Sequence, residues 1–304
     1  MMLAPLWVAL VLAQGTPYVR SHVSTTDSGS QCLFWTVPTL EWRLSSVGNP
    51  RSTDAQRERE AQAIRGAFAS WQRVFDTCGN LRFEERPEVD ERAVGYVRKG
   101  DNRNLVLFRD RRCKDVVTRV DACWPQKTCG NLYDCWDGDD GTIALTLTTY
   151  DEKSGIIYDS DIQLNASRFV FTTADSPECP NLASGRSNAC VANDVQNTMT
   201  HEIGHLLGLD HTPLDSSATM YPRAPLGEVS KRAVDPGAQR FVCATYPRGA
   251  PSQSCVTPST PSSGTATVLG QQVSGCSSAG RGMGLSALVT AALLAWRRRG
   301  GRPS

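Results

Sequence analysis

Three of the chain's four histidines lie within eleven positions, in the stretch THEIGHLLGLDH. His201 and His205 are four residues apart, so on an α-helix they share one face. If the helix continued, His211 would lie roughly 9 Å along the axis from His205, too far away to bind the same ion. Gly208 stands between them and readily adopts the left-handed conformation that ends a helix. The spacing therefore predicts three imidazoles converging on one zinc ion.

Glu202 follows the first histidine directly, so it points about 100° around the helix, beside the metal. Zinc with three histidine ligands keeps one position for water and lowers the pKa of that water to about 7. A neighbouring carboxylate can take the proton as the water attacks a carbonyl carbon. The alternative is a helix with two ordinary histidines and no ion. Gly208 and His211 favour a hydrolytic zinc centre.

The helix that carries the histidines also has a pattern for burial. An apolar stripe at helical spacing lies roughly opposite the histidine face and consists of Val195, Met199, Ile203 and Leu206. Asp194 is placed to cap its N-terminus. We expect one face to meet the core and the other to line a cleft.

The pattern H-E-x-x-H-x-x-G-x-x-H with a downstream methionine resembles the metzincin zinc endopeptidases. The chain is similar to their matrixin branch in IRGAFASWQRVFDTCGNLRFEE, which matches the first helix and the following strand. Further matches are GTIALTLTTYDEKSGIIYDSDIQLN, for the edge strand and the next one, and the closing KRAVDPGAQRFVCATYP. The resemblance covers residues 31–247. In astacin-like relatives a tyrosine lies two residues after the methionine, where this chain has Pro222.

The resemblance implies a zincin-like α+β domain with a twisted five-stranded mixed sheet, two long helices and a small C-terminal subdomain. Substrate would lie antiparallel to the edge strand near Ile143 to Leu147. Met220 would form a floor beneath the zinc ligands, and Tyr221 and Pro222 would wall the pocket just after the scissile bond.

Two features of animal matrixins are missing from the sequence. Leu145 and Ile157 stand where the second, structural zinc would have histidine ligands, so we expect one zinc per chain. An inhibitory pro-domain with a cysteine switch is also missing, so any latency must come from elsewhere.

The residue patterns agree with an α+β domain. Helical spacing covers residues 53–80, where Thr53 and Gln56 form a capping box and Gly79 marks the end. The expected strands lie within residues 32–45, 81–87, 103–110, 142–151 and 155–165.

We interpret the chain as an exported zinc endopeptidase that acts on protein or peptide substrates, with Glu202 as base and then as acid. The competing interpretation is a catalytically silent binding module with the same fold on the cell surface. Glu202 argues against that module, because binding alone needs no base beside the metal.

Eleven cysteines favour export to an oxidising compartment. The insertion at residues 111–136 holds four of them without a C-x-x-C pair, which favours two local disulfides over a second metal cluster. Cys179 and Cys190 would close another short loop. Without Cys276, ten cysteines allow five bridges, whose pairing the sequence leaves open.

Acidic residues after the insertion offer hard oxygen ligands for calcium. The candidate calcium ligands are Asp137, Asp139, Asp140, Asp159 and Asp161. A solvated acidic turn is the alternative.

The two ends of the chain resemble processing segments. Residues 1–15 predict a signal peptide, or else a buried first strand, and a short N-terminal segment follows at 16–30. The Ser/Thr/Pro-rich stretch 248–274 predicts a flexible linker. Residues 275–304 resemble bacterial C-terminal sorting tags of the MYXO-CTERM type, in which a cysteine, here Cys276, marks the processing and lipid-attachment point. The alternative is an unprocessed membrane anchor.

Charge gives no sign of a nucleic-acid partner. The whole chain carries +1, but its last 24 residues hold five arginines and no acid. Without them, 27 basic residues face 31 acidic ones, so the basic excess belongs to the tail. We expect a monomer that meets the membrane only through the tag.

Overall fold

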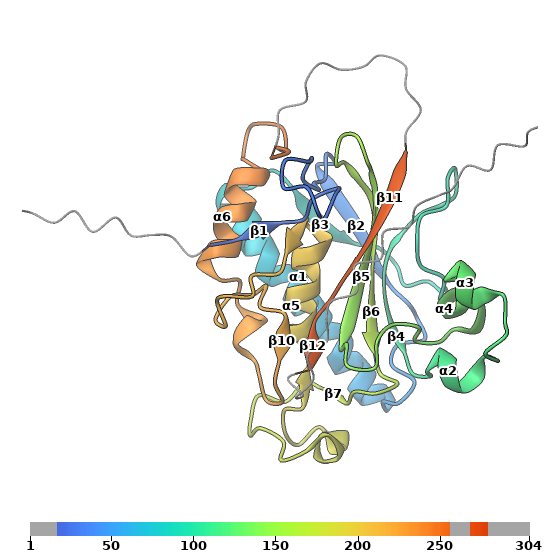
Figure 1. The fold of residues 1–304 in the computed structure, drawn as a ribbon. Coiled ribbons are helices and arrows are strands. Elements are labelled where there is room, and N and C mark those ends of the chain that lie inside the picture. Colours follow the sequence, from blue (N-terminus) through green and yellow to red (C-terminus); the bar gives the residue numbers. More distant parts are fainter. Residues whose placement is uncertain (1–16, 256–267, 279–304) are drawn as a thin grey trace, which may run out of the picture.

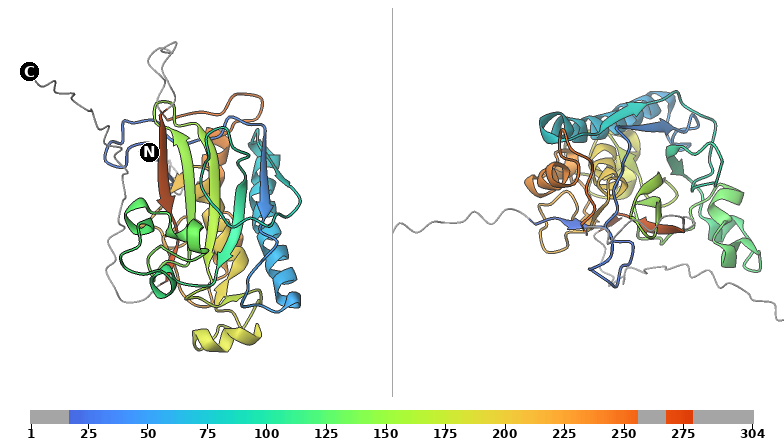
Figure 2. Two further views of the ribbon diagram at one scale, coloured as in Figure 1. Left: turned by 90° about the vertical axis from the view of Figure 1, so that its right-hand side faces the viewer. Right: turned by 90° about the horizontal axis from the view of Figure 1, so that it is seen from above.

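The computed structural model describes residues 17–255 and 268–278 (Figure 1). The predicted signal peptide and most of the predicted tag lie outside these residues. A six-stranded mixed sheet has the order β11-β5-β6-β4-β2-β3, and helices α1 and α5 pack on one face of it. The view from above in Figure 2 shows the helices on one side of the sheet and the insertion on the other. The α+β prediction is confirmed.

The strands of the main sheet are β2 (Thr39–Leu44), β3 (Arg82–Glu85), β4 (Asn104–Arg109), β5 (Ala144–Asp151), β6 (Ile157–Asn165) and β11 (Leu269–Ser274). Strands β2, β3, β4 and β6 run parallel, whereas β5 is antiparallel to both β6 and β11. Short strands pair outside this sheet: β1 (Val19–Arg20) with β9 (Leu209–Asp210), β7 (Phe171–Thr172) with β8 (Asn193–Asp194), and β10 (Arg223–Ala224) with β12 (Ser277–Ser278).

The long helices begin and end where the sequence places their caps. Helix α1 (Asp54–Cys78) starts with the Thr53–Gln56 capping box and ends at Gly79. Helix α5 (Val195–Leu206) is capped by the Asp194 side chain, which accepts from the Asn197 N–H at 2.7 Å. The other helices are α2 (Cys113–Val116), α3 (Cys123–Gln126), α4 (Cys129–Tyr133) and α6 (Pro236–Thr245), with 3₁₀ turns at Leu182–Ser187 and Ser230–Arg232.

The core lies between the sheet and the two long helices. The predicted apolar stripe of α5 is fully buried there, together with the inward face of α1. Trp71 of α1 is completely enclosed, and its indole N–H donates to the Thr200 carbonyl of α5 at 2.9 Å. This bond fixes the rotation of the histidine helix against its neighbour. None of the helices within the described residues is long and apolar enough to cross a membrane.

The prediction of a flexible linker at residues 248–274 is wrong at both ends of that range. The prediction of five strands in the sheet is also wrong, because the sheet has six. Residues 269–274 form the sixth strand, β11, and Cys255 is tied to Cys32 by a disulfide. The residue composition did not predict β11, because its pairing with β5 uses backbone N–H and C=O groups. Any residue except proline supplies both groups, so the pairing leaves no signal in the sequence.

Five disulfides confirm the number of bridges that the sequence allows. Within the insertion Cys113 pairs with Cys135 and Cys123 with Cys129, and Cys179 pairs with Cys190 as predicted. The long-range pairs are Cys32–Cys255 and Cys78–Cys243, which span 223 and 165 residues. Cys276 is the one free cysteine of the described residues, and it is buried.

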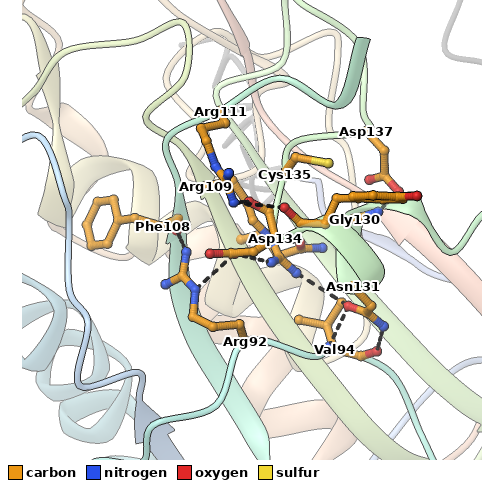
Figure 3. A network of polar contacts seen from close by, with 12 residues as sticks. Arg92, Val94, Phe108, Arg109, Arg111, Gly130, Asn131, Asp134, Cys135 and Asp137 are labelled. Atoms are coloured by element: carbon orange, nitrogen blue, oxygen red, sulfur yellow. Dashed lines mark hydrogen bonds and ion pairs between the residues drawn. The ribbon is translucent and has the colours of Figure 1, made fainter. Parts of the chain in front are cut away.

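A polar network attaches the insertion to the sheet (Figure 3). Arg109 on β4 is completely buried, and its guanidinium contacts Asp134 at 2.6 Å and Gln163 at 2.9 Å. Arg92 contacts the same Asp134 oxygen at 2.9 Å. Asp134 thus holds two guanidinium groups, one of them without access to water.

We expect Asp134→Asn to lower the free energy of unfolding by about 2 to 4 kcal/mol, because Arg109 would keep a buried charge without its carboxylate. Asparagine tolerates the left-handed φ of 47° at this position, so the variant removes charge and keeps the turn. Urea unfolding with the disulfides intact measures the change. The control is Asp101→Asn, whose side chain is 81% exposed beside Arg103 and should cost under about 1 kcal/mol. Equal losses in the two variants would contradict the role of Asp134.

Candidate zinc site

The chain leaves helix α5 between the second and third histidines, as the spacing predicts. Gly208 adopts a φ of +98°, and a Cβ there would lie 2.4 Å from the Leu33 carbonyl oxygen. Only glycine fits this close approach. The chain then enters β9, which pairs with β1 and carries the following residue, His211, back toward the helix.

The three imidazoles face one another. Their ring centroids are 4.8 Å apart for His201 and His205, 4.7 Å for His205 and His211, and 5.3 Å for His201 and His211. One nitrogen from each ring lies within 4.8 Å of the other two. The Nε2 atom of His201 is buried without a hydrogen-bond partner. A buried, unpaired acceptor that faces two further imidazoles fits a metal ion, and three nitrogens suit zinc.

Backbone carbonyls orient two of the ligands. Nδ1 of His201 donates to the Thr219 carbonyl at 2.7 Å, and Nδ1 of His205 donates to the Leu209 carbonyl at 2.9 Å. A proton held on Nδ1 leaves the lone pair of Nε2 free for the metal. Burial lowers the pKa of all three histidines, and for His201 and His205 the pKa falls well below its ordinary value. The rings are therefore neutral, as metal ligands must be.

Glu202 is completely buried beside this cluster. Burial raises its pKa to about 8, against two hydrogen bonds that favour the carboxylate. Thr146 of β5 donates its hydroxyl to Oε2 at 2.7 Å, and the backbone N–H of Cys276 donates to Oε1 at 3.0 Å. Sequence reasoning missed Thr146. Its only signal was a hydroxyl on the predicted edge strand.

Met220 packs against helix α5 at Gly204, and its role as a floor beneath the ligands stays a prediction. It is 1% exposed, and a Cβ on Gly204 would lie 2.2 Å from its sulfur. Sequence reasoning also missed Gly204. Glycine is unfavourable inside a helix, so its presence there was a signal that another group packs closely against the backbone. The Pro222 carbonyl accepts a hydrogen bond from the Ser277 N–H at 2.9 Å, while the preceding Tyr221 ring lies 6.0 Å from the Lys231 ammonium.

Residues 106–236 match the family model of the matrixins. This chain carries a matrixin domain. With the three histidines intact and Glu202 buried beside them, the domain is that of a zinc-dependent endopeptidase, and its substrates are proteins. The match runs from β4 to the start of α6, within the range of the sequence resemblance. Comparison with curated proteins found no match.

The five candidate calcium ligands do not come together as the histidines do. Asp137 accepts the Gly130 N–H at 3.1 Å (Figure 3), and Asp140 forms an ion pair with Lys114. Asp159 and Asp161 are buried side by side on β6, where burial raises the pKa of both carboxyls.

Among the described residues, side chains able to ligate a metal come together in two groups of three: the three histidines of the candidate zinc site, and His22 with Cys32 and Cys255. In the second group both sulfurs belong to a disulfide. Calcium binding stays a prediction.

We expect Gly204→Ala to lower the free energy of unfolding by about 1 to 3 kcal/mol, because the new methyl group would displace Met220 from beneath the ligands. Zinc affinity should fall with it. The matched control is Gly66→Ala inside α1, where the nearest atoms belong to the flexible Gln196 side chain at 3.2 Å. That change should be neutral or stabilising by up to about 1 kcal/mol. Thermal unfolding measures the stability of both variants, and zinc titration measures their affinity. Equal effects of the two substitutions would contradict the role of Gly204.

The purified, oxidised chain should contain one zinc ion, measured by elemental analysis. His205→Ala should lose that zinc, since two imidazoles remain from a set of three. Two tightly held zinc ions per wild-type chain would contradict the single-site prediction made from Leu145 and Ile157.

Proposed function

We propose that His201, His205 and His211 hold the catalytic zinc and that Glu202 moves the proton of peptide hydrolysis. The observation that carries this proposal is the enclosed carboxylate of Glu202 next to three neutral imidazoles, one of which has a buried nitrogen without a partner. A bound zinc supplies Lewis-acid polarisation of the scissile carbonyl and a water of lowered pKa.

Two hydrogen bonds hold the Glu202 carboxylate in place for this work. The Thr146 hydroxyl donates to Oε2, and the backbone N–H of Cys276 donates to Oε1. In the reaction the carboxylate takes a proton from water and then gives it to the leaving amine nitrogen. Thr146 is a positioning residue in this scheme, because it acts through Glu202.

The substrate is an extended chain that aligns with the edge of β5. Met220 supports the ligands from below, and Tyr221 and Pro222 form the wall on the far side of the cleft. The support for this arrangement is that backbone groups of both β5 and Pro222 already hold an extended segment between them.

The protein is extracellular, as its five disulfides and its matrixin domain indicate. For the whole chain we propose a signal peptide at residues 1–15, a catalytic domain at 31–247 and a C-terminal sorting tag that begins at residue 275. Cell-surface attachment would then depend on the tag. We further propose that the domain acts as a monomer and that any ion beyond zinc is calcium.

Glu202→Ala tests the mechanism against the interpretation as a silent binding module. All three zinc ligands remain, so zinc content and thermal stability should change little. Cleavage of unfolded casein should fall at least about a hundredfold, since general acid–base assistance is typically worth about 10² to 10⁴ in rate. A wild-type chain that is folded and loaded with zinc but cleaves no protein would overturn the proposal, as would a Glu202→Ala variant that cleaves casein at the wild-type rate.

A further inference from the structure

A segment of the chain itself lies where a substrate would lie. Strand β11 runs antiparallel along most of β5, from Leu269 opposite Asp151 to Ser274 opposite Thr146 (Figure 1). Antiparallel to this edge is the direction expected of substrate. The chain continues past the zinc site and forms β12, which pairs in parallel with β10.

Backbone hydrogen bonds hold this segment from both sides of the cleft. On the side of β5, the Ile143 N–H donates to the Cys276 carbonyl at 2.8 Å, and the Ser278 N–H donates to the Gly141 carbonyl at 2.9 Å. On the opposite side, the Ser277 N–H donates to the Pro222 carbonyl at 2.9 Å. Bonds of this kind recognise any extended peptide, whatever its side chains.

The peptide bond between Gly275 and Cys276 lies at the catalytic groups. Its N–H donates to Oε1 of Glu202 at 3.0 Å, so the nitrogen lies against the carboxylate that protonates a leaving amine. The backbone of Gly275 lies against the His211 imidazole. The side chain of Cys276 is completely buried just after this bond. The backbone of Gly275 and Cys276 thus contacts both Glu202 and His211.

Only glycine fits before that bond. A Cβ at position 275 would lie 2.1 Å from the Ala144 carbonyl oxygen and 3.0 Å from a methyl carbon of Leu145. A backbone oxygen cannot move aside without breaking the β5 pairing. The fit of the segment therefore depends on Gly275.

We propose that the enzyme hydrolyses its own Gly275–Cys276 bond and so separates the catalytic domain from its C-terminal tail. The inference rests on the proposed function. Water adds its oxygen to the carbonyl carbon of Gly275, the C–N bond breaks, and Glu202 carries a water proton to the nitrogen of Cys276. The products are a domain that ends in the Gly275 carboxylate and a tail that begins with Cys276.

This assignment differs from processing by a separate sorting enzyme that requires the cysteine. The Cys276 thiol is buried and forms no disulfide, and it has no role in the hydrolysis proposed here. Self-cleavage needs the backbone of residues 269–278 and a glycine at 275, so it should tolerate a small residue in place of the cysteine.

The experiment follows full chains, produced with oxidised disulfides, by intact-mass analysis and N-terminal sequencing. Wild type should yield new ends at Gly275 and Cys276, and Glu202→Ala should slow this cut at least about a hundredfold. Gly275→Val should remain uncut and still cleave added casein, because valine would clash with the Ala144 carbonyl and keep the segment from seating, while the catalytic groups are unchanged. Cys276→Ala and the control Val273→Ala, whose side chain is 55% exposed on β11, should be cut at the same bond as wild type.

A second readout uses a synthetic decapeptide with the sequence of residues 269–278. The Gly275→Val chain should cut it between glycine and cysteine, and the double variant Gly275→Val with Glu202→Ala should not. Because the segment of a Gly275→Val chain does not seat in the cleft, this pair of variants measures the effect of Glu202→Ala on an added peptide alone.

The outcomes separate this inference from the proposed function. Wild type that cleaves casein but keeps its Gly275–Cys276 bond overturns self-cleavage and leaves the endopeptidase proposal standing. A cut at that bond in Glu202→Ala as fast as in wild type assigns it to another peptidase and also overturns the inference. Loss of both casein and tail cleavage in folded, zinc-loaded wild type refutes the proposed function itself.

Discussion

The zinc site depends on one turn, in which the chain reverses after helix α5. Three imidazoles can meet only if the helix stops before Gly208, and there the backbone passes too close to Leu33 for any other residue. The helix end is then completed from outside. The Trp35 indole donates to the Leu206 carbonyl at 2.8 Å, the Tyr246 hydroxyl donates to the Leu207 carbonyl at 2.6 Å, and the Ser21 N–H donates to the Gly208 carbonyl at 2.8 Å. Carbonyls that a helix leaves unpaired are thus satisfied by groups far away in sequence.

This turn explains where the long-range disulfides lie. The groups that complete it come from the N-terminal residues 21–35 and from the residue after α6. Cys32–Cys255 fixes the first of these segments, and Cys78–Cys243 joins α1 to α6. Each bridge closes a loop of well over a hundred residues, which in the chain-entropy model is worth about 5 kcal/mol. The two disulfides therefore hold together the distant segments that complete the turn after α5 and so position the histidines.

The sequence predicted the parts of the site that local geometry determines. The ligand spacing, the Asp194 cap, the apolar stripe and the break at Gly208 all follow from one helix and the way it ends. The five parallel and antiparallel strands of the predicted sheet were likewise found from their residue patterns. Thr146 and Gly204 were missed, because their roles depend on Glu202 and Met220 being brought to them by tertiary packing. Strand β11 was missed for a related reason, since its residues pair through the backbone and carry no apolar pattern of their own.

The edge of β5 is both the proposed binding site for substrate and the strand with which the C-terminal segment pairs. An open strand edge offers unpaired N–H and C=O groups to any extended chain, which is how a protease can bind many sequences and also why a folded protein tends to cover such an edge. Here the cover is a segment of the same chain, in the orientation expected of substrate, with the Gly275 backbone against a zinc ligand. While that segment is in place, it pairs with the backbone groups of β5, and its Cys276 N–H donates to Oε1 of Glu202. Under the proposed self-cleavage, breaking the Gly275–Cys276 bond would free this edge for other peptides, so the same backbone groups would serve first the tail and then the substrate.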